Sequence, residues 1–254
     1  YSNFSDILRS ISIVTFVAIG ITFSLIVDGF DLSAGSTVSL ATIGSAAALV
    51  LFRQELLVAL IIPIVIGIAV GLINSFLVVK VKLPDLLATL AVMYIVNGIH
   101  LTYTKGYSIY NSMPLEGGGT ATGKFIPSFL FIGQGSLFSI PFSALLMIIT
   151  VILVHLFLQY TKPGRLFYMT GGNREAARLS GIPVNRYRTY AYVLSGVFAA
   201  IAGIILASRI GTGQVSAGAP LLMDGVAAAF IGISVFGAGK PNVIGTFFGA
   251  VLIG

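Results

Sequence analysis

Apolar residues fill long stretches of the chain that contain no charged side chain, and short polar segments separate one stretch from the next. A helix needs about 20 mostly apolar residues to cross the hydrocarbon core of a bilayer. Stretches of this kind cover residues 10–27, 32–52, 56–79, 86–104, 125–161, 189–208, 225–239 and 241–254. The pattern therefore predicts an all-α fold, a polytopic membrane helix bundle with about eight spans, of which the last two are short.

The stretch 125–161 is too long for a single span, and two prolines, Pro127 and Pro141, interrupt it. Proline is tolerated best in the first turn of a helix, where its missing N–H would have no partner in any case. We therefore predict a spanning helix at 141–160 and an interfacial or re-entrant segment at 125–140.

The two ends of the chain do not resemble natural protein ends. Asp6 and Arg9 precede the first apolar stretch without a convincing signal-peptide cleavage site, and Gly254 lies inside an apolar run. We expect residues 1–254 to form a single transmembrane domain that is truncated at both ends, with further helices on either side.

Composition supports the membrane assignment. Apolar residues make up 57% of the chain and charged residues only 9%, and the mean hydropathy is +1.03. A typical soluble domain carries roughly a quarter charged residues. The balance excludes a soluble enzyme, a disulfide-rich secreted domain and a disordered chain. The sequence contains no cysteine, which excludes disulfides, thiolate catalysis and cysteine metal sites.

The net charge of +6 is concentrated in one loop, residues 162–188. This loop holds six basic residues against one acid, Glu175; the basic residues are Lys162, Arg165, Arg174, Arg178, Arg186 and Arg188. By the positive-inside rule the loop is cytoplasmic. Alternation then places 105–124 outside, 80–85 inside, 53–55 outside and Tyr1 outside. The excess of basic residues thus indicates which loops face the cytoplasm, and we predict no nucleic-acid partner.

Motifs for catalysis are absent from the sequence. The segment 237–241 comes nearest to a phosphate-binding loop, but Pro241 stands where serine or threonine is needed. There is no zinc-protease motif, no nucleophile elbow and no cluster of histidine with carboxylates. We therefore predict no catalytic residue, no metal site and no bound cofactor, which leaves transport as the function.

Polar residues at membrane depth are costly, so each is a candidate functional residue. The candidates for the translocation path are Asp31, Ser33, Ser36, Asn74, Thr89, Asn97 and Asp224. Two interpretations of 31–36 remain open: a loop in which Asp31 or Ser33 caps the next helix, or the start of a half-helix whose N–H groups face a polar cavity. Asp224 fits a helix cap beside an outer loop at 209–223, or a gate residue.

The cytoplasmic loop contains signals for a short helix. Asn173 is a good N-cap, and a helix over 174–180 would stop at Gly181 and Pro183. Two turns are too short to be stable alone, so this helix needs a docking partner. Two patterns of small residues, at 67–71 and 245–249, predict close helix packing within one subunit.

The loop resembles a known family. Glu175, Ala176 and Ala177, followed by Gly181, resemble the cytoplasmic signature of permease subunits of ATP-binding-cassette importers. Other matching segments are similar to the ribose-type monosaccharide branch: 31–36, Gly67 to Asn74, Pro84 to Thr89, and 237–250. Two departures are Ala34, where the branch has valine, and Asn97, where an arginine is usual before the glycine.

The resemblance implies a permease subunit in the bacterial plasma (inner) membrane that forms the path for a ribose-like monosaccharide. A second permease subunit would pair with it, cytoplasmic ATP-binding subunits would bind ATP and grip a coupling helix at 173–181, and a periplasmic or lipid-anchored solute-binding protein would deliver the sugar. Glu175 would engage the ATPase surface, and Ala176 and Ala177 would fit its groove. The alternatives are a branched-chain amino acid or nucleoside permease, and a secondary transporter or channel.

Overall fold

The computed structural model describes residues 2–115, 117–235 and 239–254. The long helices are α1 (Ser2–Ile26), α2 (Ala34–Ala46), α3 (Leu56–Ser75), α4 (Asp85–Thr104), α6 (Phe142–Tyr160), α9 (Val184–Ile210), α10 (Gly218–Val235) and α11 (Val243–Ile253). Shorter helices are α5 (Pro127–Gln134), α7 (Lys162–Gly172) and α8 (Arg174–Leu179), and π-helical turns extend α2 (η1, Ala47–Leu51) and α3 (η2, Phe76–Lys80). Four two-residue strands complete the fold: β1 (Ile109–Tyr110), β2 (Ser136–Leu137), β3 (Ile140–Pro141) and β4 (Thr212–Gly213).

The prediction of a polytopic helix bundle is confirmed. Seven helical segments of the described chain are long and apolar enough to cross a membrane, and α11 is a shorter apolar helix. Apolar side chains on α3, α4 and α6 are exposed, as contact with lipid requires; they include Leu57, Ile61, Val65, Tyr94, Ile95 and Ile149. The strands pair in two small antiparallel ladders, β1 with β4 and β2 with β3.

Two predicted helix starts were wrong. Helix α9 begins at Val184 rather than 189, because its first polar turn projects beyond the apolar stretch. Helix α10 begins at Gly218 rather than 225, so Asp224 lies inside the helix and does not cap it. The predicted stretch 225–239 runs past the end of α10 at Val235, and its residues 236–238 lie outside the described chain.

The segment 125–140 does not form a span, as predicted. Its helix α5 has eight residues, too few to cross the bilayer, and the β2–β3 hairpin leads from it into α6. Pro141 occupies the N-cap position of α6, directly before the first helical residue. The Ser208 hydroxyl of α9 holds α5 by donating to the Phe129 carbonyl oxygen at 2.6 Å and accepting from the Gly133 N–H at 2.7 Å.

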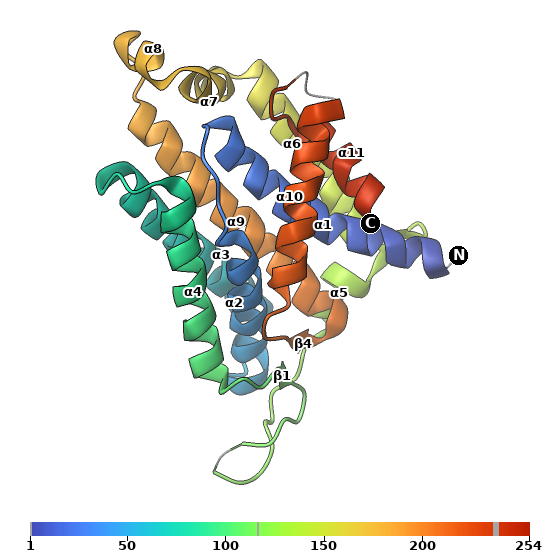
Figure 1. The fold of residues 1–254 in the computed structure, drawn as a ribbon. Coiled ribbons are helices and arrows are strands. Elements are labelled where there is room, and N and C mark those ends of the chain that lie inside the picture. Colours follow the sequence, from blue (N-terminus) through green and yellow to red (C-terminus); the bar gives the residue numbers. More distant parts are fainter. Residues whose placement is uncertain (1, 116, 236–238) are drawn as a thin grey trace.

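The polar loops gather at the two ends that alternation predicts. Helices α7 and α8 lie at one end of the bundle, and β1 and β4 lie at the other (Figure 1). Lys82 and Arg174 line one cavity, so the loop 80–85 shares the end of α8. At the opposite end, the Arg53 guanidinium donates to Thr122.

Helix α9 runs through the centre of the bundle and packs against α1, α2, α3, α5 and α7 (Figure 1). Small residues let its neighbours approach closely: a Cβ on Gly67 of α3 would overlap the carbonyl oxygen of Gly196 on α9. In the same way a Cβ on Gly249 of α11 would overlap the carbonyl oxygen of Ala228 on α10. Both small-residue patterns therefore pack within the subunit, as predicted.

Candidate functional site

The predicted helix in the basic loop is present as α8. The Asn173 side-chain oxygen accepts hydrogen bonds from the backbone N–H groups of Glu175 (3.1 Å) and Ala176 (2.9 Å), which confirms Asn173 as the N-cap. The helix ends at Leu179, one residue before the predicted end, and Gly181 follows with a φ of +79°, a backbone conformation that favours glycine.

The two faces of α8 differ in exposure. Glu175, Ala176 and Leu179 point outward, and the Leu179 side chain is 84% exposed although it is apolar. Ala177 is only 4% exposed, because Ile182 and Val184 fold back onto it after the turn at Gly181. We expected Ala177 to fit the groove of an ATPase; in this chain its methyl group is covered by Ile182 and Val184, and the expectation stays a prediction.

Sequence reasoning missed α7, the helix that precedes α8. The Thr161 hydroxyl accepts from the N–H of Gly164 at 3.2 Å and caps the helix, with Pro163 in its first turn. Phe167 anchors α7 on the bundle through edge-on ring contacts, including one to Phe23 at 5.8 Å. The threonine and proline at its start are a recognisable start signal. Most of 162–188 is therefore helical.

The loop is tied to the connection between α1 and α2. A Cβ on Gly171 would overlap the carbonyl oxygen of Ile26, so the end of α7 lies directly against the end of α1. The Arg174 guanidinium donates to the backbone oxygen of Asp28 and pairs with its carboxylate at 3.1 Å. Helices α7 and α8 are therefore in direct contact with residues 26–28.

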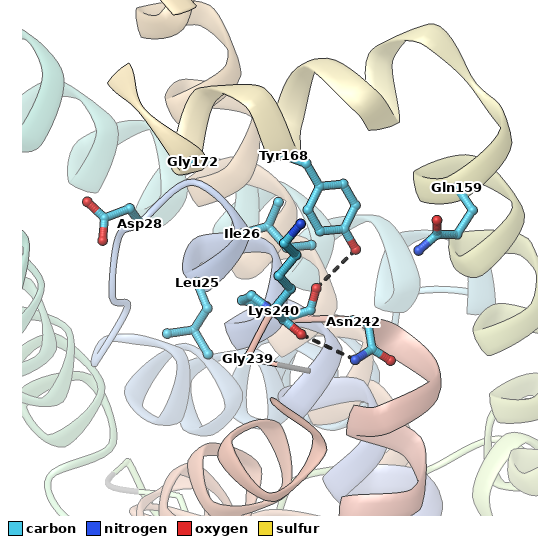
Figure 2. Close-up of a pocket in the computed structure, with 11 residues that line it drawn as sticks. Leu25, Ile26, Asp28, Gln159, Tyr168, Gly172, Gly239, Lys240 and Asn242 are labelled. Atoms are coloured by element: carbon cyan, nitrogen blue, oxygen red, sulfur yellow. Dashed lines mark hydrogen bonds between the residues drawn. The ribbon is translucent and has the colours of Figure 1, made fainter. Parts of the chain in front are cut away.

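A cavity of about 640 Å³ lies between the end of α1, helix α7 and residues 239–242 before α11 (Figure 2). The Tyr168 hydroxyl crosses it and donates to the Pro241 carbonyl oxygen at 3.0 Å. Burial raises the pKa of this hydroxyl, so it stays protonated and remains a donor at physiological pH. Gly239 and Lys240, from the segment 237–250 of the family resemblance, line the cavity, whereas 237 and 238 lie outside the described residues.

Several of the predicted path residues meet around the carboxyl group of Asp31, which is 1% exposed. It accepts from the Ser33 N–H (2.9 Å), the Ser33 hydroxyl (2.7 Å), the Ser195 hydroxyl (2.7 Å) and the Asn74 amide (3.3 Å). Asn74 also donates to the Ser33 oxygen at 2.7 Å. We call Asp31, Ser33, Asn74 and Ser195 the polar cluster. It joins the start of α2 to α3 and α9.

The two interpretations of 31–36 each describe part of this arrangement. Ser33 precedes the first residue of α2, and Asp31 fixes its N–H, as the capping interpretation states. Asp31 is nevertheless buried inside the bundle, and the segment after α1 descends between helices before α2 begins (Figure 1). Helix α2 with η1 is long enough for a span, so it is not a half-helix.

Other predicted path residues lie at different distances from the polar cluster. The Ser36 hydroxyl bonds to the Ser33 carbonyl oxygen at 2.8 Å, and the Thr89 hydroxyl bonds to the Phe30 carbonyl oxygen at 3.2 Å, so both adjoin it. Asn97 lies about 12 Å further along α4 by helix rise, where its side-chain oxygen meets His100 at 3.0 Å. Asp224 is half-buried on α10.

Removing the carboxyl group from the polar cluster should destabilise the protein. We expect Asp31→Ala to lower the free energy of unfolding by about 2 kcal/mol, because buried donors from Ser195 and Asn74 lose their acceptor. The measurement is thermal unfolding in detergent. The matched control is Asp28→Ala, since its carboxylate is 73% exposed and surface ion pairs contribute about 1 kcal/mol or less. Equal losses from both variants would contradict a clamping role for Asp31.

Sequence reasoning also missed Ser195 and the contacts that Asp85 makes with Arg188 and Tyr192. Ser195 is one of two serines in the apolar stretch 189–208, and its position opposite Asp31 follows only from the packing of α9. Asp85 and Arg188 were assigned to loops, yet they pair at 2.9 Å with side chains only 18% and 11% exposed. The Tyr192 hydroxyl also donates to Asp85, at 2.6 Å. Arg188 and Tyr192 are one helical turn apart, so an earlier predicted start of α9 would have placed both side chains on the same face of that helix.

These features define a class of protein: a multi-pass membrane protein whose spanning helices form one bundle. Within the described residues, no group of three or more histidine and acidic side chains is placed to hold a metal ion. The chain belongs to the family described as the permease component of the branched-chain amino acid transport system, whose model matches residues 3–254. It is a permease of the bacterial plasma membrane.

Curated relatives match nearly the whole chain. The ribose import permease of Haemophilus influenzae is 36% identical over 254 residues, which cover 99% of this chain and 75% of the relative. The ribose import permease of Bacillus subtilis is 34% identical, with 99% and 74% covered. The galactose/methyl galactoside import permease of Escherichia coli is 33% identical, with 98% and 76% covered. No solved structure matches the chain.

Proposed function

We propose that this protein is the permease of an ATP-binding-cassette importer for a ribose-like monosaccharide, and that separate cytoplasmic ATP-binding subunits drive it by holding α8. The observation that carries the proposal is the exposed surface of α8, where Leu179 presents an apolar side chain 84% exposed beside Glu175 and Ala176. A short capped helix with an uncovered apolar side chain suits a docking element.

The contacts of α8 support a route for the mechanical coupling. Arg174 joins α8 to Asp28, and Asp31 follows three residues later in the same connection. Asp31 in turn holds Ser195 of α9 and Asn74 of α3. When the ATPases close, movement of α8 would pull on residues 27–33 and thereby shift α2 against α3 and α9.

The choice of substrate rests on the relatives. Several curated relatives at 32–36% identity over nearly the full chain are ribose import permeases, and others at 29–33% carry galactose and methyl galactoside. A second candidate is a branched-chain amino acid, because the family is described by that substrate. A second permease subunit and a solute-binding protein at the outer face complete the proposed importer, with Asn97 and Asp224 as path residues.

Reconstitution with the cognate ATPase and solute-binding protein tests the proposal. We expect ATP-dependent uptake of labelled ribose into vesicles, and we expect Leu179→Asp to reduce it at least tenfold, because burying a leucine at an interface contributes about 1.5–3 kcal/mol. The matched control is Phe138→Asp: Phe138 is 97% exposed in the β2–β3 hairpin at the opposite end and should leave uptake unchanged.

Three outcomes would contradict parts of the proposal. Uptake of leucine in place of ribose would assign the amino acid as substrate. Ribose flux without any ATPase would indicate a channel or secondary transporter. Undiminished binding of the ATPase by the Leu179→Asp variant would remove α8 as the docking element.

A further inference from the structure

A strongly basic cavity of about 670 Å³ opens at the inner end of the bundle, between the start of α4, the end of η2 and the loop that carries α8. Four basic residues line it, namely Lys82, Arg174, Arg178 and Arg188, and its single acidic lining residue is Asp85. We call this the basic cavity. It is distinct from the polar cluster and from the outward surface of α8.

The basic side chains at this cavity are only partly neutralised by the protein. The Nε atoms of Arg174 and Arg188 have no hydrogen-bond partner among the described residues, but they are buried, so a ligand would reach the exposed side chains of Lys82 and Arg178. Pro84 occupies the N-cap position of α4 and provides no side-chain cap for the first N–H groups of that helix. Accessible basic side chains and the positive end of a helix dipole at one site favour an anion with several oxygen atoms.

The acidic groups near the basic cavity already have partners. Asp85 is held by both Arg188 and Tyr192, and Asp28, just outside the cavity, pairs with Arg174. Lys82 and Arg178 are exposed at the rim and add two positive charges. The site therefore carries an excess of positive charge that the protein itself does not neutralise.

An apolar groove continues from the basic cavity along the side of the bundle. It has a volume of about 550 Å³ and shares Val79 and Asn185 with the basic cavity. Leu72, Phe76 and Tyr190 wall it, and each of these side chains is at least 49% exposed; two basic residues, Lys80 and Arg186, also line it. The groove lies between the inner ends of α3 and α9, where the spans meet the membrane surface. A ligand that fills both spaces needs a charged head and an apolar chain.

We propose that an anionic phospholipid of the inner leaflet binds here, with its phosphate in the basic cavity and an acyl chain along the apolar groove. Anionic lipids are enriched in cytoplasmic leaflets, and basic pockets between membrane helices bind their head groups. A free phosphate ion would use the basic cavity alone, and an acidic segment of a protein would leave the apolar groove empty. The lipid would contact both α4 and α9, next to the loop that carries α8.

Native mass spectrometry of the purified full-length permease tests the proposal. Phosphatidylglycerol and phosphatidylcholine with identical acyl chains are titrated separately in detergent. We expect a tightly bound phosphatidylglycerol, and we expect Lys82→Gln with Arg178→Gln to weaken it on the order of tenfold or more, since each basic residue near the surface contributes about 1 kcal/mol. The conservative pair Lys82→Arg with Arg178→Lys should retain it.

The matched control removes equal charge from the same loop outside the cavity. Lys162→Gln with Arg165→Gln alters two exposed residues of α7 and should leave binding within about twofold. Equal weakening in both double variants would show diffuse attraction and overturn the site. Binding of phosphatidylcholine as tightly as phosphatidylglycerol, or full displacement by millimolar inorganic phosphate, would also overturn it. If an acidic segment of the ATPase bound in the basic cavity in place of the lipid, the ligand of the cavity would be a protein and the proposal would be wrong.

Discussion

Replacing Arg188 by methionine is expected to lower the free energy of unfolding by about 3 kcal/mol, which makes it one of the most damaging polar substitutions in the chain. The Arg188 guanidinium donates to both oxygens of Asp85, at 2.9 and 3.0 Å, where the two side chains are 11% and 18% exposed. Methionine fills a similar volume but leaves the carboxylate without its counter-charge. Removing one partner of a buried ion pair typically costs about 3–5 kcal/mol, and the partial exposure of Asp85 places the effect at the lower end.

Thermal unfolding in detergent measures this effect, and a fall in Tm of about 6–12 °C is expected on the scale known for chains of this length. The double variant Asp85→Asn with Arg188→Met should recover most of the loss, because asparagine carries no charge and still accepts from Tyr192, which donates at 2.6 Å. Arg186→Met is the control, since Arg186 is exposed. If the double variant is as unstable as the single one, packing rather than charge is responsible.

The two arginine–aspartate pairs at the inner end differ in strength, and the difference matters for movement of the loop. Arg174 and Asp28 are 37% and 73% exposed, so their pair contributes about 1 kcal/mol or less. Arg188 and Asp85 form the buried pair, which joins α9 to α4 within the bundle. The ion pair that joins α9 to α4 is therefore stronger than the one that joins α8 to Asp28.

The order and approximate positions of the spans could be predicted from the sequence because hydrocarbon forces every backbone polar group into a helix and makes charged side chains costly. The number was close: about eight spans were predicted, and the described chain has seven with α11 as a shorter apolar helix. The same rule explains the errors at the boundaries. Arg186 and Arg188 marked the end of a loop in the charge pattern, yet α9 already begins at Val184. Asp224 suggested a helix cap, yet α10 accommodates it half-buried in its second turn.

In the candidate site, features that depend on neighbours in sequence could be predicted, and features that depend on contacts between distant residues could not. Helix α8 and its cap Asn173 depend on neighbours in sequence, so local signals were sufficient. Asp31 and Asn74 could be selected because polar groups at depth are rare, but Ser195, which donates to Asp31, lies 164 positions further along the chain. The inward orientation of Ala177 depends on the return of the chain after Gly181, which no pattern of residue types specifies.

Replacing Gly67 by leucine is expected to disrupt the contact between α3 and α9 and to lower the free energy of unfolding by about 3 kcal/mol or more. A Cβ at Gly67 would overlap the backbone carbonyl of Gly196, and one at Gly71 would lie 2.5 Å from the carbonyl oxygen of Tyr192. Overpacking costs about 1–3 kcal/mol where side chains can adjust. Here the obstacle is backbone, so the two helices themselves must separate, and the contacts that they share would be lost.

Gly98→Leu is the matched control, because Gly98 lies on an exposed face of α4 with no heavy atom within 4 Å of an added Cβ. We expect this variant to keep the Tm of the original protein within about 2 °C, whereas Gly67→Leu should give little monodisperse protein in size-exclusion chromatography. The chromatogram also separates two roles for the small-residue pattern. If the Gly67→Leu protein is folded but elutes as a monomer where the original protein elutes as a dimer, Gly67 lies at an interface between subunits, which would contradict its position against Gly196. If the variant instead gives no folded monomer, the result agrees with the α3–α9 contact.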